Sequence, residues 1–327
     1  MATTDAPGEV EHVGSATLDA PLSPARIQRS RLGYTWWFIR RYPIIPVFVL
    51  SILVITAVIG PSVAPYQRDI GPVGDRHLGI FKYSELPADQ QDAPKHSLWP
   101  AGFHLLGSDH IGRDVFTRVL HGARISMQVV MVSLFLGMFV GVSLGVIAGF
   151  YGGIIDELIT RIVDIWYAMP FLMVALIVTL IFGRGLTVLL FVLALISWTA
   201  FVRVIRAQIM VLKEMDYVAA ARVSGSSDFR IMFRHLVPGV LNTAIVVGTL
   251  STSGLILAES VLSFVGAGIQ PPTPAWGVMT NEGRDYLTVA PHQVLVPSAA
   301  IFLVVISLNF LGDWLRDRLD PILRQID

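Results

Sequence analysis

Apolar residues in this chain are concentrated in long windows that contain no Asp, Glu, Lys or Arg. A helix needs about 20 such residues to cross the ~30 Å hydrocarbon core of a bilayer, because each residue advances the helix by ~1.5 Å. Lipid offers the backbone no hydrogen-bond partners, so windows of this length are expected to be helical. The pattern predicts six membrane-spanning helices, over about 42–64, 125–150, 165–183, 185–206, 238–260 and 290–312.

The remaining segments are predicted to connect these helices. Three prolines interrupt the charge-free stretch 260–281, which is therefore expected to be the end of the fifth helix followed by a loop. The polar segment 65–107 is predicted to be an extracytoplasmic insertion, and 213–238 a cytoplasmic loop. Residues 1–31 lack the basic region and apolar core of a signal peptide. They are expected to form a disordered cytoplasmic tail before one membrane domain over 32–327.

Composition agrees with a membrane protein. Hydrophobic residues make up 54% of the 327 residues and charged residues 15%, against about 25% charged residues in a typical soluble domain. Lys plus Arg and Asp plus Glu number 24 each, and there is no Cys. These values argue against a disordered chain, a nucleic-acid binder that relies on bulk positive charge, and a disulfide-stapled secreted fold.

The distribution of Lys and Arg sets the predicted orientation. With the N-terminus inside, 15 of them lie on cytoplasmic segments and 9 on outer segments, as the positive-inside rule favours. We therefore expect a multi-pass protein of the bacterial cytoplasmic membrane with both termini in the cytoplasm. Arg113, Arg118 and Arg124 oppose this bias. They are expected on an interfacial helix, with side chains that reach the lipid headgroups.

Four glycines in the second predicted span repeat at every fourth residue, at Gly137, Gly141, Gly145 and Gly149. This spacing places them on one helix face and leaves a groove without side chains, where a neighbouring helix can approach closely. The groove predicts either static close packing or a helix that slides against its neighbour.

Charged residues are confined to the ends of the predicted spans. Glu259 and Asp313 lie near helix ends and are interpreted as helix-end charges, while the middles of the spans carry no Asp, Glu, Lys or Arg. A proton- or ion-coupled transporter usually places ionisable residues near mid-membrane. The pattern therefore disfavours a secondary transporter and indicates that another component supplies the energy.

A membrane enzyme is a further alternative, and its candidate site is one segment rich in His and Asp. His104, Asp109, His110, Asp114 and His121 are residue types that bind metals, but their spacing matches no known ligand pattern. We interpret them as structural or interfacial, and expect no catalytic residue and no metal site.

The chain also has no expected nucleotide site. A P-loop needs a Gly immediately before its Lys, whereas Lys82, Lys95 and Lys213 follow Phe, Pro and Leu. The sequence thus predicts that the chain binds no cofactor and that another polypeptide hydrolyses any ATP used.

The predicted cytoplasmic loop contains two short helices around a bend. Alanines at 219–221 favour helix, Gly225 suits a helix C-terminus, and Ser226, Ser227 or Asp228 can cap a second helix. The second helix is expected to carry an apolar stripe opposite two arginines and to stop at a proline. Its stripe is Phe229, Met232, Phe233 and Leu236, its arginines are Arg230 and Arg234, and its stop is Pro238. Such an element suits either a partner's groove or the lipid surface.

This loop resembles the EAA motif of ABC importer permeases, which reads Glu-Ala-Ala, three residues, Gly, nine residues, Ile, one residue, Leu-Pro. The spacing fits, although Ala219, His235 and Val237 replace the motif's Glu, Ile and Leu. In that family the loop is a coupling helix that docks on the ATPase subunit. The resemblance implies that coupling involves Asp216, Ala219, Ala220, Ala221, Gly225, Phe229, Arg230, Arg234 and Pro238.

Three further segments resemble the dipeptide, oligopeptide and nickel permeases, and specifically their C-type subunit. They are residues 106–126, 264–285 and 309–321. The resemblance extends from about Arg29 to Arg324. It implies an all-α integral membrane protein with six spans and the type I ABC importer permease fold.

The same resemblance implies the function and the partners. The chain would form half of the pathway of an ATP-driven importer of di- or oligopeptides, working by alternating access. Its partners would be a homologous B-type permease subunit, ATPase subunits that bind ATP and Mg, an extracytoplasmic substrate-binding protein and the bilayer, with no nucleic acid. Nickel or another small molecule is the alternative cargo.

The loop after the fifth span carries the last candidate site. It contains Gln270, Pro271, Pro272 and Trp276, and its prolines make it stiff. Trp side chains favour the membrane interface. The loop is expected either to frame the outer mouth and contact the binding protein, or to be a rigid re-entrant connector.

Overall fold

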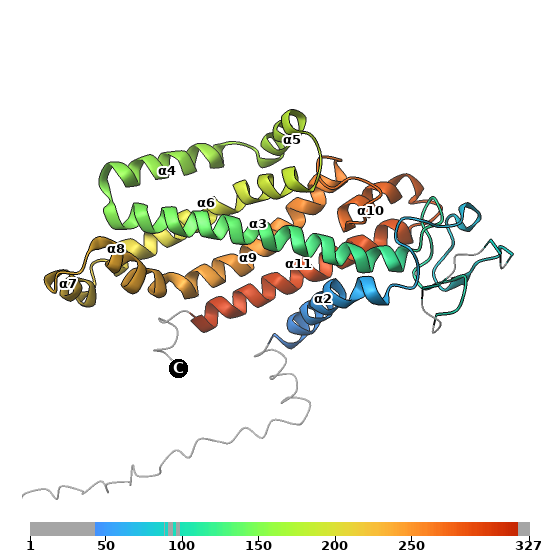
Figure 1. Ribbon diagram of the computed structural model, residues 1–327, viewed down its shortest axis with the longest axis horizontal. Helices are drawn as coiled ribbons and strands as arrows, with labels where there is room; N and C mark the ends of the chain where they lie inside the picture. Colours follow the sequence, from blue (N-terminus) through green and yellow to red (C-terminus); the bar gives the residue numbers. More distant parts are fainter. Residues whose placement is uncertain (1–42, 88, 91–93, 96–98, 320–327) are drawn as a thin grey trace, which may run out of the picture. The chain divides into compact units, whose positions relative to one another are not determined.

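The computed structural model describes residues 43–319, apart from 88, 91–93 and 96–98. The tail predicted over 1–31 lies outside the described residues. The described chain is mostly helical, and five of its helices are long and apolar enough to cross a membrane (Figure 1). They are α2 (Ile44–Val63), α3 (Val115–Tyr151), α6 (Leu186–Leu212), α9 (Val237–Phe264) and α11 (His292–Leu319).

The span predicted over 165–183 is not one straight helix. The structure instead has α4 (Gly153–Ala168) and α5 (Phe171–Phe182), which meet at an angle of 90° and together make a sixth candidate crossing. Pro170 explains the break, because a proline disfavours helical backbone at the residue before it, and Met169 is extended with φ −87° and ψ 128°. The charge-free window gave the length of the apolar segment but not its bend.

The helix end predicted at Pro238 is wrong. Helix α8 (Asp228–Ile231) continues through the π-turn η2 (Met232–Leu236) into α9, and residues 228–264 qualify as one membrane-spanning helix. Pro238 lies in the first turn of α9. The wider π-turn before it satisfies the local backbone, because the Val237 amide donates to the Met232 carbonyl, and a proline is tolerated at such a helix start.

Helices α3 and α6 pack along the glycine groove. A Cβ atom at Gly141 would lie 2.3 Å from the Trp198 carbonyl oxygen, and one at Gly149 would lie 2.8 Å from the Arg206 carbonyl oxygen. The other two glycines, Gly137 and Gly145, face Ser197 and Ile205 of α6 in the same way. Backbone packed this closely leaves no room for a side chain, so the groove is the seam between these two helices.

The segment between α2 and α3 folds onto the first turns of α3. It contains the 3₁₀ turn η1 (Val73–Asp75) and a two-stranded antiparallel sheet of β1 (Lys82–Tyr83) and β2 (Phe103–His104). The Tyr66 amide donates to Thr117 Oγ1 at 3.3 Å. After α9, the short helices α10 (Trp276–Gly283) and η3 (Arg284–Tyr286) lead into α11.

Arg118 and Arg124 lie within α3 itself, and not on a separate interfacial helix as predicted.

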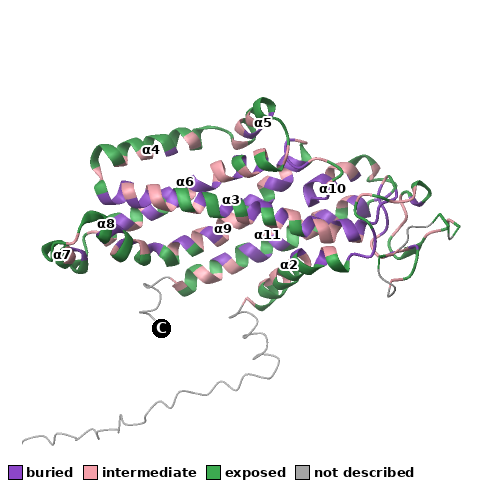
Figure 2. Cartoon of the chain, viewed as in Figure 1, coloured by how far each residue is buried: buried purple, intermediate pink, exposed green. Residues whose placement is uncertain are grey.

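Most helices of the bundle carry buried residues where they meet neighbouring helices and exposed residues elsewhere (Figure 2). The outward residues of α2, α4 and α5 include many large apolar side chains, as expected of surfaces that meet lipid or another membrane chain.

Candidate functional site

The segment that resembles the EAA motif lies at one end of the bundle, and the 65–107 segment with α10 lies at the other (Figure 1). Helix α7 (Asp216–Val223) ends in a bend at Gly225, whose φ is +76°. The Ser226 amide donates to the Ala221 carbonyl and the Gly225 amide to the Arg222 carbonyl, which is a Schellman motif. Ser227 then caps α8, because its hydroxyl accepts from the Arg230 amide at 3.4 Å.

The apolar stripe predicted for the second helix is divided between two faces. Met232 and Leu236 are buried, but Phe229 is 66% exposed and Phe233 58% exposed. The two exposed rings pack against each other, with centroids 4.4 Å apart. A single amphipathic stripe is therefore wrong. Ile231, which the stripe omitted, is fully buried together with Met232 and Leu236, whereas Phe229 and Phe233 face outward.

Two buried residues hold this segment onto the bundle. Val218 of α7 and Ile231 of α8 pack with Phe150 of α3 and with Ile205 and Ile209 of α6. The side chains that remain exposed are those of Asp216, Ala219, Ala220, Phe229, Arg230, Arg234 and Pro238, whereas Ala221 is half-buried. The segment thus exposes small alanines, an aromatic pair and two arginines, while its buried residues pack on α3 and α6.

The ends of α3, α4 and α6 are tied together beside this segment. Lys213 Nζ donates to the Gly149 carbonyl at 2.9 Å. Arg206 of α6 forms a two-pronged ion pair with Asp156 of α4, in which Nη2 lies 2.6 Å from Oδ2. A bidentate Arg–carboxylate pair fixes orientation as well as distance, so these contacts hold the three helix ends in a fixed arrangement.

A buried ion cluster, which no local sequence pattern indicated, lies at the end of the bundle opposite to α7 and α8. Asp109 Oδ2 lies 2.6 Å from both Arg113 Nε and Arg118 Nη1, and Glu282 of α10 lies 3.1 Å from Arg113 and 2.8 Å from Arg118. Both arginines are fully enclosed. Burial alone raises the pKa of Asp109, but Arg118, Arg113 and the Ile111 and Arg113 amides outweigh it and hold the pKa below its usual value.

Glu259 is not a helix-end charge at a surface, as the sequence suggested. Its side chain is 0% exposed. It accepts hydrogen bonds from Ser263 at 2.9 Å, from Ser126 of α3 at 3.2 Å and from Ser260 at 3.3 Å. The Ser263 hydroxyl also accepts from the Ile269 amide at 3.3 Å, so this carboxyl joins α3, the end of α9 and the loop that follows.

The predicted outer loop has a buried base and an exposed tip. Trp276 is 3% exposed, and its Nε1 donates to the Val119 carbonyl at 3.2 Å, so its side chain is enclosed within the protein. Gln270 donates to the carbonyls of Gly266 and Gly268, both at 3.1 Å. Only Pro271 and Pro272 are exposed among the four predicted residues.

The His and Asp residues of the candidate metal segment make structural contacts in different places. His104 bonds Asp114 at 2.8 Å, and the Asp114 carboxylate also caps α3 by accepting from the Thr117 amide at 2.7 Å. His110 stacks on Tyr286, and His121 donates to the Thr117 carbonyl at 2.9 Å. In the described ranges, no group of three or more His, Asp or Glu side chains is arranged to hold a metal ion.

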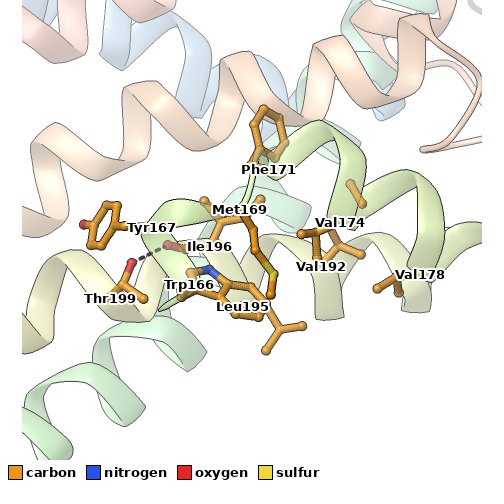
Figure 3. Close-up of a pocket in the computed structure, with 11 residues that line it drawn as sticks. Trp166, Tyr167, Met169, Phe171, Val174, Val178, Val192, Leu195, Ile196 and Thr199 are labelled. Carbon is orange, nitrogen blue, oxygen red and sulfur yellow. Dashed lines mark hydrogen bonds between the residues drawn. The ribbon is translucent and has the colours of Figure 1, made fainter. Parts of the chain in front are cut away.

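The break between α4 and α5 leaves a hollow of about 120 Å³ against α6 (Figure 3). Its lining is uncharged and mostly apolar, and includes Trp166, Met169, Phe171 and Ile196. The Thr199 hydroxyl at its edge already donates to the Ile196 carbonyl at 3.3 Å. This hollow therefore suits an apolar group and offers no reactive chemistry.

Comparison with known proteins assigns the family. Residues 141–325, more than half of the chain, match the family described as "Binding-protein-dependent transport system inner membrane component". The chain belongs to this family. It is the membrane-spanning permease subunit of an ABC importer in the inner membrane, and such importers also contain an ATPase and a substrate-binding protein.

The permease aligns over most of its length with two relatives of known name. It is 42% identical over 225 residues to the "Glutathione transport system permease protein GsiD" of Pectobacterium atrosepticum, covering 69% of this chain and 75% of the relative. It is 37% identical over 270 residues to the protein of the same name from Escherichia coli O1:K1 / APEC, covering 83% of each chain.

The fold of the permease is also found in a solved transporter. The inward-facing MetNI methionine ABC transporter matches with a TM-score of 0.50 at 18% identity, covering 62% of this chain and 96% of that chain. This likeness concerns the arrangement of the helices. It supports the expected all-α permease fold, with five helices long enough to span a membrane and a sixth crossing from the bent pair.

Proposed function

We propose that the permease forms half of the pathway of an importer for small peptides, paired with a homologous B-type permease subunit. The observation that carries the substrate class is the 37–42% identity to relatives named for glutathione transport, since glutathione is itself a tripeptide. The resemblance of three further segments to C-type subunits of peptide and nickel permeases supports the place of this chain in the pair.

The end of the bundle that carries α7 and α8 faces the cytoplasm, with both chain termini on that side. The excess of Lys and Arg on the corresponding segments supports this orientation. The 65–107 segment, α10 and the exposed Pro271–Pro272 tip then face outward. This tip is the part of the predicted outer loop left free to contact the substrate-binding protein.

The segment 213–238 docks on the ATPase subunit, which binds ATP and Mg, while this chain binds no cofactor. Exposed Ala219 and Ala220 allow close approach, and Phe229 with Phe233 supplies an aromatic anchor. Aromatic side chains, Phe among them, are enriched in the cores of protein interfaces. The ties to α3, α4 and α6 then carry ATPase closure into the spans, which alternate between inward- and outward-facing packings.

The coupling part of the proposal is tested with Phe229→Ala in the purified importer. We expect weaker retention of the ATPase, by about tenfold in affinity for a lost aromatic anchor, with unchanged thermal stability of the permease. Phe182→Ala is the matched control, because Phe182 is an exposed phenylalanine of α5 that lies outside the docking segment. Equal ATPase retention by both variants would contradict the docking surface.

The substrate class is tested separately, in proteoliposomes that contain the wild-type importer and its binding protein. Uptake of labelled glutathione or dipeptides, driven by ATP, is the expected result. Uptake of nickel without any peptide would replace the proposed cargo and leave the coupling surface intact. The two experiments thus fail independently of each other.

A further inference from the structure

A second kind of site lies on the outside of the bundle, where the last turn of α2 meets the first turns of α3. A hollow of about 650 Å³ opens there, and its cationic lining consists of Arg68, Lys95 and Arg124. His121 and Gln128 lie beside them on α3. We call this the cationic hollow. None of its residues takes part in the coupling surface or in the buried ion cluster.

The charges in the cationic hollow do not cancel. Asp69 is the one acid in its lining, and it is already paired with Arg68, with Nε 3.0 Å from Oδ2. Among the residues that the structure describes, no acidic side chain forms an ion pair with Lys95 or Arg124. Within the described part of the chain, two positive charges at this place therefore have no counter-charge, and they favour an anionic group.

The walls of the hollow are held in place by two hydrogen bonds that backbone amides donate. The Lys95 amide donates to the Pro65 carbonyl at 2.7 Å, and the neighbouring Tyr66 amide donates to Thr117 of α3 at 3.3 Å. The loop that carries Arg68 is thus held against the helix that carries Arg124. A preformed cationic site loses less entropy on binding than one assembled from free side chains.

One face of α3 continues from the cationic hollow into the membrane. Arg124 and Gln128 are followed at helical spacing by Val132, Phe135 and Phe139, and all five are exposed. Charge-free sequence begins at residue 125. A cationic group at the top of an exposed apolar strip matches a phospholipid, because the phosphate meets the cations while an acyl chain lies along the strip. A soluble carboxylate would use only the top.

We propose that the cationic hollow binds the phosphate of an anionic phospholipid, held by Arg124 and Lys95, with an acyl chain along Val132, Phe135 and Phe139. The lipid fills the space between α2 and α3 and secures α2 to the bundle. The site is separate from substrate import and does not depend on which substrate is carried.

The test uses the complete importer in nanodiscs that contain phosphatidylglycerol and phosphatidylcholine. After exchange into detergent, native mass spectrometry counts the phosphatidylglycerol retained. We expect Arg124→Gln to lower the retention by about tenfold, because it removes a charge-assisted hydrogen bond, and Arg124→Lys to keep most of it. Arg124 has no partner within the described chain, so the variants are expected to fold, which size-exclusion chromatography checks.

Arg284→Gln is the matched control, since Arg284 is an exposed arginine at the same end of the protein that does not line the hollow. Equal retention by the Arg124→Gln and Arg284→Gln variants would overturn the proposal. So would displacement of the lipid by inorganic phosphate or glutathione, which would indicate a site for soluble anions. Crosslinking from position 124 to the partner permease, and not to lipid, would also overturn it.

Discussion

Ser126 on α3 donates a hydrogen bond to the carboxyl of Glu259 on α9, across 3.2 Å, at a place where Glu259 has no exposed surface. The same carboxyl is bonded to Ser263, which in turn receives the Ile269 amide of the following loop. Burying an ionisable side chain within a membrane bundle costs free energy. Its position here is explained by the three segments that it connects.

Replacing Glu259 with Leu is expected to lower the free energy of unfolding by about 1–3 kcal/mol, the range for leaving buried hydrogen-bonding groups without a partner. Thermal unfolding of the purified importer measures the effect. Glu259→Gln should lose less, because its amide oxygen still accepts from a hydroxyl. Glu157→Leu is the control, since Glu157 is exposed on α4. A control as destabilised as Glu259→Leu would contradict this role.

The glycine seam predicts a sharp contrast between two Gly→Ala changes in spanning helices. At Gly141 a Cβ atom would lie 2.3 Å from the Trp198 carbonyl oxygen, whereas at Gly254 nothing lies within 4 Å. Overpacking of this kind costs about 1–3 kcal/mol. The fraction of chain recovered as intact importer should therefore fall for Gly141→Ala and stay unchanged for Gly254→Ala. Similar recovery of both would mean that α3 and α6 separate easily.

The buried ion cluster predicts the effect of removing Asp109. Asp109→Asn leaves Arg113 and Arg118 with one acid, Glu282, and breaking a buried pair costs about 3–5 kcal/mol. Thermal unfolding of the importer measures the loss. Asp285→Asn is the control, because its pairing with Arg284 is exposed and surface pairs contribute about 0–1 kcal/mol.

The lowered pKa of Asp109 sets the pH dependence of that difference. A carboxyl whose pKa is lower in the folded than in the unfolded state adds stability above the unfolded value, and loses it as the pH falls through the folded value. The wild type should therefore stay more stable than Asp109→Asn at pH values above about 3.9, the pKa of an unperturbed aspartate, and the gap should close only below that pH, because the pKa of Asp109 is lowered in the folded protein. A gap that closes near pH 5 would contradict the assigned ion pairs.

The bend at Gly225 predicts a loss of coupling. Its φ of +76° is a conformation that proline cannot adopt, and its amide is bonded to the Arg222 carbonyl. Gly225→Pro should therefore displace α8 and lower the peptide imported per ATP hydrolysed, measured in proteoliposomes. Gly225→Ala should cost about 1 kcal/mol through backbone strain alone. Unchanged uptake in the proline variant would show that the bend is dispensable.

Local sequence was sufficient for features that depend on neighbouring residues. The apolar windows predicted where the long helices lie, because the hydrocarbon thickness sets the length of an apolar helix. The repeat of glycines predicted a side-chain-free groove, and the Gly225 and Ser227 signals predicted the bend and the cap. These signals are contained within a few turns of one helix.

The tertiary structure alone decided the contacts between residues that are far apart in the chain. Asp109 and Glu282 meet around the same two arginines, Trp276 is buried against Val119, and Ser126 finds Glu259. Each residue alone resembles an ordinary polar or interfacial position. Burial and pairing depend on which helices become neighbours, and no local pattern states this. Sequence determined where most of the long apolar helices lie, and packing determined which of the charges are enclosed.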